Sequence, residues 1–204
     1  MGRVKLGLLG GTFDPPHVGH LWLAESAREQ LHLDQVLFLP VGEPPHKEGN
    51  WVTAVSQRLH MTQLAINDHP AFCLDTTDIE RPLPHTTCSL LPLIRAAHPQ
   101  ADLWLLMGAD SLRDFPTWHE PACIITQCRL AVLDRPGVVV DWPSLETAVP
   151  GLRAVTDMLA GPTMDISSTA VRHWARHNHS LRYLVPPQTI QFIQQAGLYT
   201  EITR

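Results

Sequence analysis

The sequence has little positive charge. Of its 204 residues only Lys5 and Lys47 are lysines, and the 15 lysines and arginines together are outnumbered by 20 aspartates and glutamates. A protein that binds nucleic acids through their phosphates normally carries an excess of basic residues. The formal net charge of -5 therefore predicts that nucleic acid is not a partner.

Long apolar runs are also missing. No stretch approaches the roughly 18 consecutive apolar residues of a membrane span, and the N-terminal segment lacks the basic region, apolar stretch and cleavage site of a signal peptide. There is no Cys-x-x-Cys pair, so we expect reduced, mostly buried thiols at Cys73, Cys88, Cys123 and Cys128. These absences predict a cytoplasmic protein that does not contact membranes.

A dedicated metal site is not expected either, although the chain has 12 histidines. His17 and His20 are three residues apart but have no third ligand type nearby. His173 and His177 are one helical turn apart, where a helix dipole favours histidine without any metal. The sequence therefore predicts no metal ion held by protein side chains.

What the sequence does contain is an alternation of apolar strands and amphipathic helices, enough for one α/β domain spanning residues 1–204. Strands are expected at 4–9, 35–40, 71–74, 102–107, 129–133 and 153–158, and helices among them at 18–30, 88–97 and 187–195. This alternation predicts a Rossmann-like, doubly wound, mostly parallel sheet with helices on both faces. A small C-terminal helical part, about 165–204, is expected to complete the domain.

Local signals set the expected ends of several elements. Thr53 or Ser56 is expected to cap the second helix, and Pro92 is expected in the first turn of its helix. Proline and glycine punctuation predicts loops at 78–85 and 115–118.

The stretch Leu6–His20, reading LGLLGGTFDPPHVGH, is the clearest functional signal. An apolar strand runs into the turn Gly10-Gly11-Thr12, where the backbone can approach a ligand closely, and His17 and His20 lead into a helical pattern. A helix start after such a turn makes an anion site, because its free N–H groups and the positive end of its dipole point at the turn. Two imidazoles at this place predict a bound polyphosphate.

The same stretch resembles the signature of the nucleotidyltransferase superfamily, whose T/H-x-G-H tetrad is matched by His17-Val18-Gly19-His20. A second motif, Ile166-Ser167-Ser168-Thr169-Ala170-Val171-Arg172, resembles the superfamily segment that holds the β- and γ-phosphates of ATP. Serine and threonine at a helix start also leave N–H groups and hydroxyls facing an anion. Together the two motifs imply transfer of an adenylyl or cytidylyl group.

Further segments are similar to one family of the superfamily, the nicotinate mononucleotide adenylyltransferases. They are Leu39-Pro40 with His46-Lys47, Arg58-Leu59-x-Met61, Gly108-x-Asp110, Pro116-Thr117-Trp118, Tyr183-Leu184-Val185-Pro186 and Gly197-Leu198-Tyr199. The resemblance covers nearly the whole chain, from Leu6 to Tyr199. It implies an enzyme of NAD biosynthesis that joins ATP and nicotinate mononucleotide, giving deamido-NAD and pyrophosphate.

The resemblance also implies which residues meet ATP. His17 and His20 would be catalytic, as hydrogen-bond donors to the phosphates in the transition state. The residues implied in ATP binding are Gly10, Gly11, Thr12, Phe13, Gly19, Lys47, Gly108, Asp110, Ile166, Ser168, Thr169 and Arg172. The acceptor phosphate is already an anion, so no general base is required, and Mg²⁺ would arrive with ATP and keep mostly water ligands.

Thr86, Thr87 and Trp118 are implied in binding nicotinate mononucleotide. Trp118 resembles the family residue whose indole stacks on the pyridine ring, a contact worth roughly 1 kcal/mol or more when desolvated. The family usually has Ser-Tyr-Thr where this chain has His85-Thr86-Thr87. In the family that segment meets the nicotinate carboxylate largely through backbone N–H groups, which any residue supplies, so the assignment stands.

Three alternatives stay open at this point. Phosphopantetheine adenylyltransferase shares both phosphate motifs, but it is a shorter chain without the Pro-Pro-His-Lys loop and Trp118. Only the family resemblance argues against a preference for nicotinamide mononucleotide, and Thr86, which stands where the family has tyrosine, weakens that argument. A non-catalytic nucleotide-sensing protein belongs to another class and would be expected to lose a phosphate-binding histidine. The sequence is compatible with a monomer or a small homo-oligomer.

Overall fold

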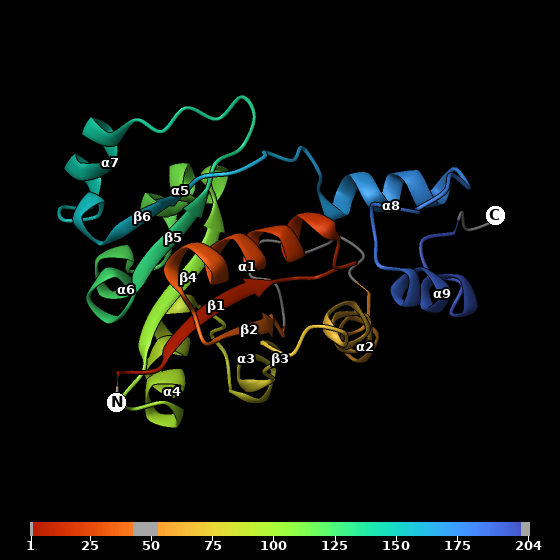
Figure 1. The fold of residues 1–204 in the computed structure, drawn as a ribbon, viewed down its shortest axis with the longest axis horizontal. Helices are drawn as coiled ribbons and strands as arrows, with labels where there is room; N and C mark the ends of the chain where they lie inside the picture. The colour runs from red at the N-terminus through yellow and green to blue at the C-terminus, as the bar shows by residue number, and fades with distance from the viewer. Residues whose placement is uncertain (1, 43–52, 201–204) are drawn as a thin grey trace.

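The computed structural model describes residues 2–42 and 53–200, and its centre is a six-stranded parallel sheet (Figure 1). The strands are β1 (Lys5–Gly11), β2 (Gln35–Pro40), β3 (Phe72–Leu74), β4 (Asp102–Gly108), β5 (Arg129–Leu133) and β6 (Thr156–Leu159). Their order is β3-β2-β1-β4-β5-β6, so the direction of winding reverses between β1 and β4. This is the predicted doubly wound sheet.

Helices cover both faces of the sheet because successive strand residues point to opposite sides. On one face Trp104 and Leu106 of β4 pack in a core with residues of α1 (Val18–Leu31) and α2 (Val55–Ile66). On the other face Leu103 and Leu105 pack with residues of α4 (Thr87–Ala97), α6 (Pro121–Gln127) and α7 (Trp142–Ala148). Both faces are therefore buried, as the apolar strands predict.

The C-terminal helices form a separate small core beside α2. They are α8 (Ser168–Arg176) and α9 (Pro187–Gln195), which Figure 1 shows next to α2 at one end of the molecule. Met61 of α2 packs there with buried residues of the C-terminal part. The backbone N–H of Val18 donates to the carbonyl oxygen of Leu184 at 2.9 Å, so this part is also tied to the start of α1.

Gly10 and Gly11 belong to β1, whereas the sequence placed them in the turn that follows it. Their backbones stay in register with the last two residues of β2, ending opposite Pro40. Because β2 continues alongside, the strand runs two residues beyond the expected range 4–9 and the turn starts at Thr12.

The expected cap of α2 is wrong. The helix is preceded by Ala54, and neither Thr53 nor Ser56 caps it. The backbone of Thr53 is engaged elsewhere, because its N–H donates to the carboxylate of Asp14 and its carbonyl accepts from Arg58.

Pro92 lies in the second turn of α4, and not in the first as predicted. Thr86 is the cap, its hydroxyl accepting from the N–H of Ser89, so the helix starts one residue earlier than expected. The expected loop 78–85 also begins inside a short helix, α3 (Thr77–Glu80), which starts where the carboxylate of Asp75 accepts from the N–H of Thr77.

Three further segments differ from expectation. Residues 109–114 form a short helix, α5 (Ala109–Asp114), that the sequence did not predict, and the predicted loop 115–118 begins with the 3-10 turn η1 (Phe115–Thr117). The expected strand 153–158 begins with another 3-10 turn, η2 (Arg153–Val155), so β6 starts only at Thr156. Each of these pieces is too short to show a helical period in the sequence.

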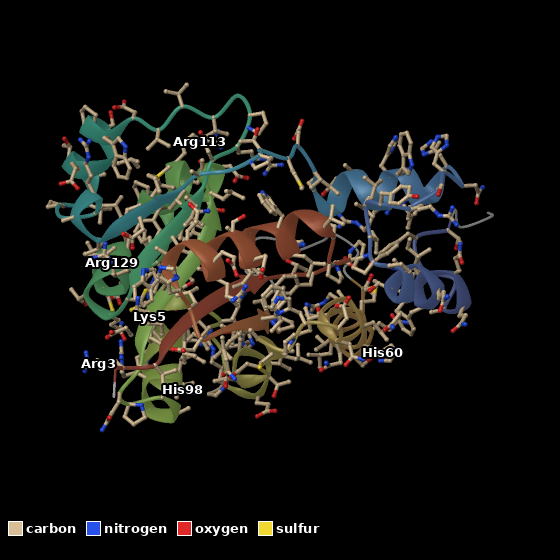
Figure 2. The ribbon with its side chains drawn as sticks, viewed as in Figure 1. Arg3, Lys5, His60, His98, Arg113 and Arg129 are labelled. Carbon is tan, nitrogen blue, oxygen red and sulfur yellow. The ribbon has the colours of Figure 1, made fainter. Side chains whose placement is uncertain are left out.

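The labelled cations of Figure 2 are paired individually with acidic groups or carbonyls. Arg3, Lys5 and Arg129 lie on the side where the strands begin, and Arg113 lies away from them in α5. Arg3 binds Asp102 at 3.0 Å and Arg113 binds Asp114 at 2.8 Å; Arg129 binds Asp157 at 2.9 Å and Lys5 donates to the carbonyl of Leu31. Within the described residues, no helix is both long and apolar enough to cross a membrane.

Candidate active site

A cleft of about 700 Å³ opens beyond the carboxyl ends of β1 and β4. This is where the winding of the sheet reverses, the usual ligand site of doubly wound folds. Most of the residues predicted for the site line it: Gly10, Gly11, Thr12, His17, Gly19, His20, Thr86, Thr87, Gly108, Asp110, Trp118, Ile166 and Ser168. Motifs from opposite ends of the chain therefore meet in one cleft.

The two histidines of the first motif stack on each other at the start of α1. Their ring centroids are 3.8 Å apart with 29° between the planes. The backbone N–H of His17 donates to Nδ1 of His20 at 3.2 Å. Because Nδ1 accepts this bond, the hydrogen of the neutral His20 ring is on Nε2, where it is available as a donor.

Both imidazoles are uncharged at neutral pH. Burial lowers the pKa of His17 from 6.5 to about 4, and the positive charge of Arg135 contributes. Burial also holds the pKa of His20 well below 6.5, with the neighbouring His17 as a second cause. Nδ1 of His17 is buried and has no hydrogen-bond partner. An unpartnered polar atom beside a cleft is a ready contact for a ligand.

We expect His17 to make the protein less stable in acid. The unfolded chain takes up a proton near pH 6.5 and the folded chain only near pH 4, so stability is lost as pH falls through this window. The 2.5-unit interval corresponds to a loss on the order of 3 kcal/mol at its acid end. Urea unfolding at pH 7 and pH 4.5 should show a smaller loss in His17→Asn than in the wild type. Equal losses of unfolding free energy in the two proteins would show that His17 is not the group responsible.

The second motif packs against the first through a close contact at Gly19. A Cβ at Gly19 would lie 2.6 Å from Cγ2 of Ile166, closer than real side chains approach. The hydroxyl of Ser168 donates to the carbonyl of Pro15 at 2.9 Å. Glycine at position 19 therefore allows the segment before α8 to reach the loop that holds the histidines.

Not every predicted residue faces the cleft. Phe13 is buried, with a φ of 48°, and its ring meets His20 edge-on at 5.0 Å. Arg172 donates to the carbonyl of Asp14 at 2.7 Å and to the hydroxyl of Thr169 at 3.3 Å, and neither Thr169 nor Arg172 lines the cleft. Lys47 lies outside the described residues.

The residues implied for the acceptor lie on another wall of the same cleft. Thr86 and Thr87 are the cap and first residue of α4, and Trp118 follows η1. Trp118 is half-buried and its ring packs 5.3 Å from that of Phe115. The wall can thus offer N–H groups at a helix start and a flat aromatic ring to one ligand.

Arg135 is the main cleft residue that the sequence did not single out. Its guanidinium binds Asp110 at 2.6 Å and donates to the carbonyl of Ile166 at 3.4 Å. It joins the start of α5 to the second motif and brings positive charge beside the histidines. Its place just after β5 is a signal that could have identified it, because such residues gather at the ligand edge of the sheet.

Two other residues that line the cleft were not predicted from the sequence. Asp78 is buried and paired with the guanidinium of Arg81. His85 lies 4.0 Å from that carboxylate and its Nδ1 is buried without a partner. No motif of the sequence identified them.

The loop of the first motif is held from behind by a buried arginine. The side chain of Arg58, only 1% exposed, donates to the carbonyls of Thr53, Thr12 and Gly42 at 3.0, 2.8 and 2.8 Å. Beside it, the hydroxyl of Tyr199 donates to Asp14 at 2.6 Å. These contacts fix the backbone that follows β1.

Comparison with known proteins agrees with this geometry. The cytidylyltransferase-like family model matches residues 8–174. A probable nicotinate-nucleotide adenylyltransferase from Thermomicrobium roseum is 41% identical over 97% of this chain and 92% of its own length. A protein of the same description from Roseiflexus sp. is 40% identical over 98% of this chain and 100% of its own.

Solved structures share the fold. Nicotinic acid mononucleotide adenylyltransferase of Plasmodium falciparum, complexed with NaAD, superposes with a TM-score of 0.79 at 18% identity, over 97% of this chain and 98% of that one. The same enzyme complexed with APC gives a TM-score of 0.77 over the same shares.

Proposed function

We propose a division of roles among the cleft residues from one premise, which is that this chain belongs to the nicotinate-nucleotide adenylyltransferase family. Its activity is transfer of the adenylyl group of ATP to nicotinate mononucleotide, a step of NAD biosynthesis. The single observation that carries our assignment of roles is the meeting of the two phosphate motifs at the stacked histidines.

His17 and His20 donate hydrogen bonds to the phosphates of ATP as negative charge develops. The proposal is supported by the neutral state of both rings, by the hydrogen on Nε2 of His20, and by the unpartnered Nδ1 of His17. A hydrogen-bond donor that is shielded from water and aimed at developing charge stabilises a transition state more than a hydrated donor does. Anionic phosphates also raise the pKa of a neighbouring imidazole, so binding would favour proton uptake.

The remaining ATP contacts are assigned to the backbone and to the second motif. Gly10, Gly11, Thr12 and Phe13 offer N–H groups, and Gly19 leaves room at the start of α1. Ile166, Ser168, Thr169 and Arg172 are assigned to the leaving pyrophosphate, Gly108 and Asp110 to the adenosine side, and Lys47 to the phosphates. The guanidinium of Arg172 already donates to the carbonyl of Asp14, so its positive charge lies behind the loop between β1 and α1.

In the reaction, an oxygen of the acceptor phosphate attacks the α-phosphorus of ATP while the bond to pyrophosphate breaks. The attacking oxygen is already anionic near neutral pH, so the protein supplies no base and forms no covalent intermediate. Its contribution is alignment of the two substrates and stabilisation of charge.

Magnesium enters in this proposal with its ATP. Of the three aspartates that line the cleft, Asp78 and Asp110 are bound by the side chains of Arg81 and Arg135, whereas Asp134 accepts, among the described residues, only from the backbone N–H of Arg135. The first two carboxylates are therefore poor direct ligands, which suits an ion bound mainly by phosphate oxygens and water. When bound, Mg²⁺ neutralises charge on the phosphates.

The substrates proposed for this chain are ATP and nicotinate mononucleotide, by analogy with the relatives and with the neighbours bound to NaAD and APC. Thr86 and Thr87 offer backbone N–H groups to the nicotinate carboxylate. We further propose a cytoplasmic enzyme, a monomer or a small homo-oligomer, with no nucleic-acid or membrane partner. The four cysteines are free thiols, which agrees with a reducing compartment.

Replacing Trp118 by alanine tests the acceptor site. If the indole stacks on the pyridine ring, the variant should raise KM for nicotinate mononucleotide about 5-fold or more, the equivalent of roughly 1 kcal/mol, while KM for ATP stays unchanged. Pyrophosphate release is measured with Mg-ATP and nicotinate mononucleotide, nicotinamide mononucleotide or phosphopantetheine as acceptor. The wild type should prefer the first.

Trp142→Ala is the matched control, because that tryptophan is also half-buried but belongs to α7. It should leave KM for both substrates unchanged. Equal effects of the two variants would refute the stacking role of Trp118. Wild-type release only with phosphopantetheine would refute the proposed acceptor itself.

A further inference from the structure

Two cysteines that lie far apart in the sequence come together with a glutamate at the start of two helices. Cys88 is the second residue of α4, Cys123 is the third residue of α6, and Glu120 directly precedes α6. Their potential ligand atoms all lie within 4.8 Å of one another. Among residues 2–42 and 53–200 this is the one group of three or more such side chains.

Two of the three groups already share a hydrogen bond, and the third is held by a neighbour on its own helix. The thiol of Cys88 donates to the carboxylate of Glu120 at 3.2 Å, and Sγ of Cys123 accepts from the side-chain amide of Gln127 at 3.1 Å. Cys88 is buried, Cys123 is half-buried and Glu120 is exposed. One side of the group is thus held by the protein while the other is open to an ion from solvent.

We propose that Cys88, Glu120 and Cys123 form a binding site for a zinc ion. Two sulfur ligands and one carboxylate oxygen are a donor set that suits Zn²⁺, which prefers tetrahedral coordination by sulfur, nitrogen and oxygen. Nε2 of the exposed His119 lies 4.0 Å from the carboxylate of Glu120, so that imidazole or a water molecule can supply the fourth ligand.

A bound cation would change the protonation of the group. Burial, together with the neighbouring Cys123 and Glu120, raises the pKa of Cys88 to about 12, so its thiol keeps its proton in the absence of metal. A bound Zn²⁺ reverses this balance, since it stabilises thiolates directly. Each thiol loses its proton to solvent as its Zn–S bond forms, so binding releases two protons and becomes tighter as pH rises.

The position of this site connects it with the cleft without making it part of the ATP-binding machinery. Thr87 is adjacent to Cys88, and Trp118 lies two residues before Glu120. An ion held by all three ligands would tie the start of α4 to the start of α6. The two segments that form the wall proposed to bind the acceptor would then be cross-linked.

Cobalt binding to the tag-free, reduced protein without nucleotides tests the proposal. Co²⁺ replaces Zn²⁺ in thiolate sites and gives a sulfur-to-metal charge-transfer absorption, which imidazoles elsewhere on the chain cannot produce. We expect this absorption to saturate at one equivalent and to disappear on addition of Zn²⁺. Absence of the absorption at one equivalent would overturn the site.

Variants separate this site from incidental binding. Cys123→Ser should abolish the absorption, and Glu120→Gln, an exposed and nearly isosteric change, should weaken Co²⁺ binding on the order of 10-fold. Cys73→Ser changes a thiol in β3 and should bind Co²⁺ like the wild type. An absorption that survives Cys123→Ser, or that Cys73→Ser removes, contradicts the assignment. Melting temperatures without metal show that each variant is folded.

Discussion

Replacement of His20 by alanine is expected to lower kcat by a factor on the order of 10² or more, the usual effect of removing one donor to developing charge. His20 is positioned by the backbone N–H of His17 and by the edge of Phe13, so its Nε2–H is aimed before substrates arrive. Pyrophosphate release at saturating substrates measures kcat. Because the lost contact strengthens in the transition state, KM for ATP should change much less than kcat.

His98→Ala is the control for this experiment. His98 lies at the end of α4, where Figure 2 labels it, and does not line the cleft. Its variant should keep the wild-type kcat. A folded His20→Ala protein with near-wild-type kcat would remove His20 from the mechanism, whatever the value of KM.

The second large effect is expected in stability. Arg58→Met should lower the free energy of unfolding by about 3 to 5 kcal/mol, because it leaves three carbonyl oxygens without their buried, charged donor. Burial lowers the pKa of Arg58 because it desolvates the charged guanidinium, and the nearby Asp14 acts in the opposite direction. Urea unfolding at pH 7 gives the difference from the wild type.

Arg113→Met is the matched control for Arg58→Met, because Arg113 is exposed and its ion pair is with the exposed Asp114. That variant should change stability by less than about 0.5 kcal/mol. Arg58→Lys keeps the charge but cannot reach three carbonyls at once, so it should fall between the wild type and Arg58→Met. Equal stability of Arg58→Met and Arg113→Met would contradict the role of Arg58 in fixing the backbone that follows β1.

The sequence was sufficient wherever a period or a motif was long. β2 and β5 have the expected ranges 35–40 and 129–133, and α9 has the expected range 187–195. Apolar runs bounded by proline or charge define such elements without help from the rest of the chain. α5 could not be found in this way, because six residues after a strand carry too little pattern.

The site divides in the same way. The motifs around His17 and Ser168 identified several residues that line the cleft beside the stacked histidines. They did not reveal that the guanidinium of Arg172 turns toward Asp14, or that Arg135 brings its charge beside His17. Those facts depend on which loops meet after folding, and loop geometry has no sequence period.

The short distance between Cys88 and Cys123 also could not be predicted from the sequence. The two residues lie in different helices separated by β4, α5 and η1, and neither has a neighbouring cysteine in the sequence. Only the packing of α4 beside α6 brings them together.

The hydrogen bond between Tyr199 and Asp14 has a consequence for synthesis of the chain on the ribosome. Asp14 emerges early, but its partner follows 185 residues later. Until then the buried carboxylate lacks the hydroxyl. The loop after β1 gains the contacts of Ser168 and Arg172 somewhat earlier, but also only after β1 to β5 have been made. The nascent chain can therefore form β1 to β5 while its nucleotide site is still incomplete. The loop after β1 would therefore reach its final hydrogen bonding only after the segment that carries Ser168, Arg172 and Tyr199 has been made.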